Sequence, residues 1–100
     1  MNKDNQLQIE LKEDVAEGTY ANLAIIAHST SEFVFDFVRM MPGVAKAQVK
    51  SRIIMTPEHA KRLAIALQDN LRRYESQCGE IRLPERQGYM PGENMYKGEA

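Results

Sequence analysis

Apolar and polar residues alternate near the start of the chain, over residues 7–11 (LQIEL). This period of two predicts a half-buried β-strand, because successive side chains of a strand point to opposite faces. Two runs rich in apolar and β-branched residues follow, over Tyr20–His28 and Glu32–Met40. Three polar residues, Ser29–Ser31, separate these runs, so the two are predicted to form a β-hairpin.

A fourth strand is predicted over Ala45–Met55. The segment before it contains Pro42 and Gly43, the preferred residue pair at the centre of a type II turn. Short connections of this kind join antiparallel neighbours. The chain is therefore predicted to form a four-stranded antiparallel sheet, arranged as a meander.

The segment after the strands has the pattern of one long amphipathic helix. Thr56 is a suitable N-cap and Pro57 suits the first helical position, while Gly79 is a suitable terminator. Apolar residues recur between them on one side of the helix: Ala60, Leu63, Ala64, Leu67, Leu71, Tyr74 and Cys78. The predicted fold is α+β, in the order β-β-β-β-α, with the helix on one face of the sheet. Ile81 and Leu83 are candidates for a short extra strand.

The central strands are apolar on both faces. Phe33, Phe35 and Phe37 point to one face of the sheet, and Val34 and Val38 point to the other. One helix covers only one face of a small sheet, so the second face needs another cover. A second copy of the chain is the expected cover, which makes these five residues the predicted oligomer interface. A groove for a ligand or an unfolded peptide is the alternative.

Length and composition indicate one domain of modest size. The chain has 100 residues, of which 43% are hydrophobic and 27% are charged, as in soluble globular proteins. Residues 85–100 show no apolar periodicity, so we expect a single domain over 1–84 and a flexible tail over 85–100. No apolar run approaches the ~20 residues that span a bilayer, so no membrane partner is expected. The single cysteine, Cys78, favours a reducing compartment and a cytoplasmic location.

The chain contains none of the common signatures of phosphate, dinucleotide, hydrolase or zinc sites. His28 and Ser29 are adjacent at the end of a predicted strand, where successive side chains point to opposite faces, so they are expected to diverge rather than act together. Asp36 is the one carboxylate on an apolar strand face. A salt bridge from it to Arg52 or Arg39 is favoured over a role as a catalytic acid. No catalytic, metal or cofactor site is predicted, and an enzyme is not expected.

Polar residues, three of them basic, recur at every second position of the last predicted strand: Lys46, Gln48, Lys50 and Arg52. The formal net charge is only −1, from 13 basic and 14 acidic side chains, so no overall field favours nucleic acid. Lys46, Lys50 and Arg52 nevertheless share one predicted face, which could lie along a nucleic-acid backbone. Lysines are also common on edge strands, where they prevent aggregation. Nucleic-acid binding through this basic face is the alternative function.

Several unusual strings occur in one order between residues 16 and 83: YAN, HSTSEF, RMMPG, SRIIMTPEHAK and CGEI. In these strings the chain resembles a family of small bacterial and archaeal proteins known as domain of unknown function number three-four-six-seven. The resemblance implies a small, standalone, soluble protein. It implies no activity and no functional residues.

The expected function is that of a non-catalytic interaction protein. The two-faced strands predict self-association as a homodimer or a tetramer. The remaining apolar surface would bind a protein or peptide partner, as a scaffold, an adaptor or a chaperone does. Ile65, which lies among charged residues opposite the apolar stripe of the helix, is a further interface candidate. The predicted element order is similar to that of SecB-type export chaperones, although no sequence motif of that family is present.

Overall fold

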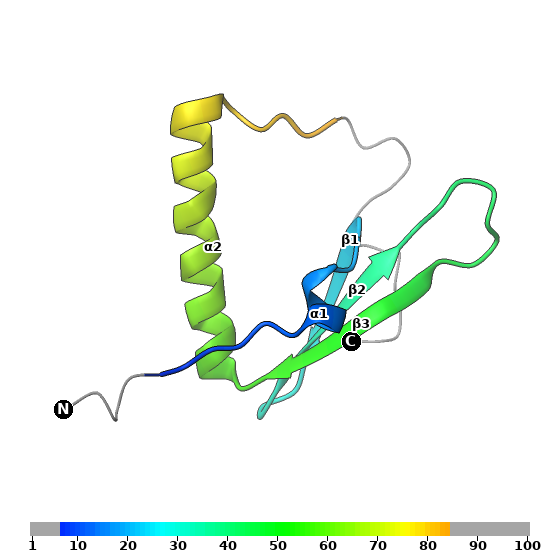
Figure 1. Ribbon diagram of the computed structural model, residues 1–100, viewed down its shortest axis with the longest axis horizontal. Coiled ribbons are helices and arrows are strands. Elements are labelled where there is room, and N and C mark those ends of the chain that lie inside the picture. Colours follow the sequence, from blue (N-terminus) through cyan, green and yellow to red (C-terminus); the bar gives the residue numbers. More distant parts are fainter. Residues whose placement is uncertain (1–6, 85–100) are drawn as a thin grey trace.

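The computed structural model describes residues 7–84 of the 100-residue chain. Within this range the elements are α1 (Glu13–Ala16), β1 (Leu23–His28), β2 (Phe33–Arg39), β3 (Gln48–Met55) and α2 (Pro57–Cys78). The strands form one antiparallel sheet in the order β1-β2-β3, and α2 leaves the end of β3 as a separate arm (Figure 1). The fold is therefore α+β with a C-terminal helix, as predicted. The predicted flexible tail, 85–100, lies outside the described residues.

The described part of the sheet has three strands rather than the predicted four. Residues 7–12 form no strand, and their apolar side chains lie in solvent: Leu7 is 81% and Ile9 is 84% exposed. The prediction of a strand over 7–11 is therefore wrong. An alternating pattern identifies a segment with one apolar face, but a strand also needs a neighbour whose backbone groups pair with its own.

The hairpin between β1 and β2 is confirmed. At its turn, the amide of Ser29 donates to the carbonyl of Glu32 (2.9 Å), and Ser29 Oγ accepts from the amides of Ser31 (3.1 Å) and Glu32 (3.3 Å). At the open end, Asn22 Nδ2 donates to the carbonyl of Met40 (3.0 Å), and Asn22 Oδ1 accepts from the amide of Met40 (2.8 Å). Short polar side chains therefore continue the backbone pairing at both ends of the hairpin.

The connection between β2 and β3 contains the predicted turn. Gly43 has a φ of 81°, a left-handed conformation that the third position of a type II turn requires and that glycine adopts without strain. β3 begins at Gln48 rather than at Ala45, so the last strand is shorter than predicted. Every residue of β3 except Lys50 nevertheless pairs with a residue of β2.

The helix α2 begins and ends where the sequence predicts. Thr56 has extended dihedral angles (φ −72°, ψ 160°), and its Oγ1 accepts from the amide of His59 at 3.3 Å. Pro57 is the first helical residue, and Gly79, with a φ of 96°, ends the helix. These are the ordinary N-cap, N1 and C-terminal signals of an α-helix.

Beyond α2 the described chain runs to residue 84 without a strand or helix. The extra strand considered at Ile81 and Leu83 is not formed in these residues. The amide of Ile81 instead donates to Oε2 of Glu75 at 2.9 Å, and Leu83 is 84% exposed. This segment therefore adds nothing to the sheet.

The position of α2 differs from the prediction that it covers one face of the sheet. α2 meets the sheet mainly at β3, and of its residues only Ala60, in the first turn, is buried. Further along the helix, Leu67 and Tyr74 are 55% and 52% exposed. The reason is the junction, because Thr56 is the only residue between β3 and α2. Connections that turn a helix back onto its sheet usually have two residues or more.

Candidate functional site

Most large apolar side chains of a single copy remain in contact with water. Among the described residues, the buried apolar side chains are Phe35, Val38 and Ala60. Large apolar side chains that are more than a third exposed occur on both helices and on both edge strands, and they include Val15, Ile26, Val49, Ile53, Ile54, Leu63, Ile65, Leu67, Leu71 and Tyr74. A domain of this size needs a closed apolar core to offset its loss of chain entropy. The candidate functional sites are therefore the uncovered apolar surfaces.

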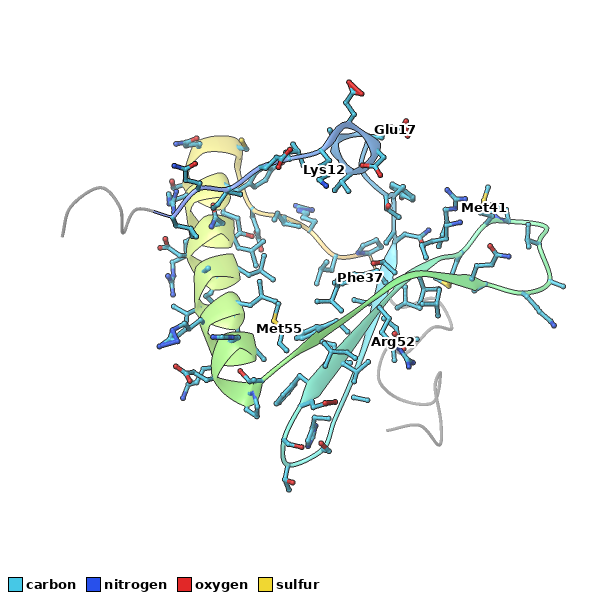
Figure 2. The ribbon with its side chains drawn as sticks, turned by 60° about the horizontal axis from the view of Figure 1, so that its bottom comes forward. Lys12, Glu17, Phe37, Met41, Arg52 and Met55 are labelled. Atoms are coloured by element: carbon cyan, nitrogen blue, oxygen red, sulfur yellow. The ribbon has the colours of Figure 1, made fainter. Side chains whose placement is uncertain are left out.

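One face of the sheet is built on a row of aromatic side chains, and we name it the Phe face. The rings of Phe33, Phe35 and Phe37 follow one another with centroids 6.4 and 6.5 Å apart. Cross-strand pairing adds residues of the two neighbouring strands to this face: Ala24, Ile26, His28, Ser51, Ile53 and Met55. Figure 2 shows Phe37 and Met55 on the side of the sheet that looks toward α2. The middle of the Phe face carries no charged side chain.

The opposite face, which we name the Asp36 face, holds an ion pair within an apolar surface. Its members are Leu23, Ile25, Ala27, Val34, Asp36, Val38, Val49, Arg52 and Ile54. Asp36 is 3% exposed and lies directly opposite Arg52 in the register. Arg52 Nε donates to Asp36 Oδ1 at 2.6 Å, and Nη2 donates to Oδ2 at 2.8 Å. Of the two partners considered for Asp36, the structure selects Arg52.

This geometry fixes the protonation of Asp36. The two hydrogen bonds from Arg52 stabilise the ionised carboxylate and lower the pKa of Asp36, and the positive charge of the guanidinium acts in the same direction. Burial alone would raise the pKa, but its effect is smaller. Asp36 is therefore an ionised structural partner rather than a proton donor at neutral pH.

The two sides of α2 differ in character. One side is the apolar stripe, which consists of Ala60, Leu63, Ala64, Leu67, Leu71, Tyr74 and Cys78. The other side carries ion pairs along the helix, between Arg62 and Glu58 (2.8 Å) and between Arg73 and Asp69 (2.9 Å). Ile65 lies on this charged side and is 62% exposed. Only the stripe offers a continuous apolar surface.

The six residues predicted as an oligomer interface belong to three different surfaces. The three phenylalanines lie on the Phe face, whereas Val34 and Val38 lie on the Asp36 face. Ile65 lies on the charged side of α2, away from both. Phe35 and Val38 are buried within one copy, at 8% and 3% exposure, so they support the sheet from inside. The Phe face is the largest uncharged part of the predicted set.

Several exposed apolar residues are not among those predicted as an oligomer interface. Ile26 and Ile53 flank Phe35 from β1 and β3, and they are 55% and 40% exposed. Leu67 is predicted from its spacing to pack under the sheet, yet it lies in solvent. The sequence contains a signal for the exposure of Leu67, because Thr56 follows the predicted strand directly and is also the helix N-cap. No residues remain between strand and helix for a loop that could turn the helix onto the sheet.

The three cations of the predicted basic face do not form one row. Lys46 precedes β3, and Lys50 is the extra residue of a β-bulge at which the pairing register with β2 shifts. Arg52 is held by the carboxylate of Asp36. A period of two keeps side chains on one face only in a regular strand, so the bulge interrupts the basic face.

The histidine and serine at the β1–β2 turn serve different contacts. The ring of His28 stacks on Phe33, with centroids 5.1 Å apart, while Ser29 Oγ accepts amide hydrogen bonds within the turn. Among residues 7–84, no three His, Cys, Asp or Glu side chains gather in the way that a metal ion requires. Cys78 is exposed at the end of α2. In the same part of the chain, no helix combines the length and apolarity needed to cross a membrane.

Comparison with known proteins gives one match. Residues 1–83 match the model of a family described as "Protein of unknown function (DUF3467)". No curated protein and no solved structure gives a significant match to the chain. The matched residues include every strand and helix described here. Because the match spans most of the chain, the protein belongs to the DUF3467 family of proteins of unknown function.

Proposed function

We propose that the protein is a non-catalytic interaction protein that acts as a homo-oligomer, a dimer or a tetramer. In this role it binds protein or peptide partners through apolar surface, as a scaffold, an adaptor or a peptide-binding chaperone. The observation that carries the proposal is the imbalance of burial in one copy. Only Phe35, Val38 and Ala60 are buried apolar side chains in the described residues, while Ile26 and Ile53 on the Phe face and the large side chains of the apolar stripe stay exposed.

The energy involved is large for a chain of this size. At about 25 cal/mol per Å², a half-exposed Leu or Ile leaves roughly 1–1.5 kcal/mol of burial free energy unrealised. Ten such side chains leave on the order of 10 kcal/mol, which is similar to the entire stability of a small domain. Association that covers part of this surface would therefore supply stability that a single copy lacks.

The sheet also offers a place for an extended partner. β1 and β3 are the two edge strands of the described sheet, so each has one row of backbone groups that faces no other strand. An extended peptide can add to such an edge, where main-chain hydrogen bonds give affinity and neighbouring apolar side chains give preference. This arrangement supports a peptide partner with apolar side chains at alternate positions.

The proposed compartment is the reducing cytoplasm of a bacterial cell. Cys78 is the single cysteine of the chain, and its side chain is exposed. An exposed lone thiol is stable where glutathione and thioredoxin keep thiols reduced.

Light scattering of the full chain at micromolar concentration tests self-association, and the expected mass is that of a dimer or a tetramer. A fluorescent peptide with leucines at alternate positions then tests partner binding. The control is the same peptide with aspartates in place of the leucines. We expect binding of the first peptide only. A monomer that binds neither the leucine peptide nor a hydrophobic dye contradicts the proposal.

Nucleic-acid binding is the competing function. The bulge at Lys50 and the pairing of Arg52 with Asp36 interrupt the basic face, so no observation favours this function. Titration of labelled duplex and single-stranded DNA at low and at physiological salt separates the two functions. Binding that weakens steeply with salt, together with no peptide binding, would replace the proposal with this alternative.

A further inference from the structure

Two apolar surfaces of one copy suit each other but lie apart beyond the first turn of α2, where Ala60 is buried. On the Phe face, Ile26 and Ile53 are 55% and 40% exposed, and on the apolar stripe Leu67 and Tyr74 are 55% and 52% exposed. Ala60, which is buried where α2 meets β3, belongs to the stripe, so the stripe is on the side of α2 that looks toward the sheet. Packing of these two surfaces against each other would bury the exposed side chains.

The junction between β3 and α2 holds the two surfaces of one copy apart. Thr56 is its single residue and is extended, as expected for a residue that precedes a proline. The ring of Pro57 fixes the next φ angle. The cap from Thr56 to the amide of His59 restricts the junction further. A connection this short and stiff cannot turn α2 back onto its own sheet, and such hinges favour the exchange of an element between copies.

We propose that α2 of one copy packs its apolar stripe against the Phe face of a second copy, and that the α2 of the second copy does the same in return. This inference rests on the self-association in the proposed function and identifies its interface. A two-fold exchange uses the same pair of surfaces twice, so neither copy is left with an open stripe or an open Phe face. The occupant of each Phe face is a helix of an identical chain.

The ion pair explains why the helix takes the Phe face rather than the opposite one. Arg52 keeps 58% of its side chain in water while it binds Asp36. A helix on the Asp36 face would remove the guanidinium from water, and the apolar stripe has only the hydroxyl of Tyr74 and the thiol of Cys78, near one end, to replace that hydration. The Phe face carries no such charge in its middle. The apolar stripe therefore fits the Phe face at lower cost.

The two surfaces also match in size. α2 has 22 residues and is about 33 Å long, whereas β2 has 7 residues and spans roughly 23 Å, so the helix can cross the whole Phe face. If a large apolar side chain that is 39–55% exposed leaves about 80 Å², the two surfaces of each copy would bury on the order of 500 Å². The side chains counted are Ile26, Ile53, Leu63, Leu67, Leu71 and Tyr74. Stable complexes bury about 800 Å² per partner, so this contact supplies more than half of what a dimer needs.

Matched pairs of substitutions test the interface. On α2, Leu67→Asp changes the stripe, and Ile65→Asp changes a similarly exposed residue on the charged side. On β3, Ile53→Asp changes the Phe face, and the adjacent Ile54→Asp changes the Asp36 face. We expect Leu67→Asp and Ile53→Asp each to raise the dimer dissociation constant at least about a hundredfold. The two controls should change it by no more than about threefold. Equal effects within either pair contradict the proposal.

Mixing Leu67→Asp with Ile53→Asp distinguishes the exchange of α2 between copies from other symmetric contacts. The Leu67→Asp chain keeps an intact Phe face, and the Ile53→Asp chain keeps an intact stripe. A mixed dimer therefore contains one complete helix–sheet contact. We expect sedimentation to show a dimer in the mixture at concentrations where each variant alone is monomeric. If either variant is unfolded alone, recovery of helical circular dichroism on mixing reports the same event. No association on mixing overturns the proposal.

A longer junction gives a third measurement. Insertion of about six Gly and Ser residues between Met55 and Thr56 should let α2 reach its own sheet. We expect a folded monomer with unchanged helical content and a dimer dissociation constant raised at least tenfold. An unchanged constant contradicts the role of the junction. If the unaltered chain is itself monomeric, the proposed function fails. If it is oligomeric and mixing restores nothing, only the exchange of α2 fails.

Discussion

At the scale of single residues, Asp36 distinguishes two sheet faces that hydrophobicity alone makes alike. The sequence alone allows a salt bridge from Asp36 to Arg39 or to Arg52. Arg39, however, is three residues away on the same strand and belongs to the Phe face. Arg52 lies opposite Asp36 on the next strand and makes two hydrogen bonds to it. One buried carboxylate thereby gives the Asp36 face a polar centre and leaves the Phe face without one.

The substitution Asp36→Asn should lower the free energy of unfolding at pH 7 by about 1–2 kcal/mol, because the amide keeps the shape but loses the charged hydrogen bonds. The pKa of Asp36 is lowered on folding from its ordinary value of 3.8, so the unfolded chain binds the proton more readily than the folded one. The contribution is therefore complete above about pH 5 and is lost as the pH falls below 3.8 and through the lower pKa of the folded state.

Urea unfolding of both proteins at one fixed protein concentration measures this effect. The difference in unfolding free energy between the native chain and Asp36→Asn should be largest at pH 7 and should shrink at pH 3. The same difference at both pH values would show that the charge of Asp36 contributes nothing.

At the scale of elements, local signals were sufficient where the structure depends on neighbouring residues. The helix Pro57–Cys78 has its cap, first proline and terminator in the sequence, and the β1–β2 hairpin has its polar turn. The predicted strand over 7–11 fails because pairing depends on a distant partner. The bulge at Lys50 is not visible in the pattern of apolar and polar residues, because a bulge depends on how two strands pair and not on residue type.

The candidate site could likewise be predicted only where it depends on the local pattern of residues. The phenylalanine row of β2 was identified from alternation alone, since a regular strand places every second residue on one face. The exposure of Ile26, Ile53 and Leu67 was not identified, because it depends on where α2 lies relative to the sheet. That position is set by the single residue Thr56, whose effect is geometric rather than compositional.

The substitution Thr56→Ala should destabilise the protein by about 1 kcal/mol, because it removes the oxygen that accepts the His59 amide at the start of α2. Thr56→Ser is the control, since it keeps that oxygen and should retain most of the stability. Urea unfolding followed by helical circular dichroism measures both. An equal loss in the two variants would assign the effect to the methyl group of Thr56 instead of the cap.

At the scale of the whole molecule, one copy consists of a sheet and a helix joined as two arms at one end (Figure 1). Each arm has regular hydrogen bonding, yet the described residues bury few apolar side chains between the arms. Secondary structure of this kind is stable only when tertiary contacts support it, because isolated helices and small sheets are marginal in water. Contacts between copies are the proposed source of that support.

The melting temperature should therefore depend on protein concentration. For a dimer whose single copies are unstable, each tenfold increase in concentration adds about 1.4 kcal/mol of stability. This corresponds to a rise in Tm of roughly 3–6 °C. Circular dichroism melts between 1 and 100 μM measure the slope, and Ile65→Asp should show the same slope as the native chain. A Tm that stays constant over this range would indicate that single copies are stable alone.

The scarcity of buried apolar side chains also bears on how much protein a cell would accumulate. A chain without a partner exposes apolar surface and opens readily, which makes it a target for proteases and chaperones. In the proposed assembly, encounter between two chains competes with this removal, and its rate grows with the square of their concentration. The amount of assembled protein would therefore rise faster than in proportion to synthesis, and a small loss of expression would lower it disproportionately.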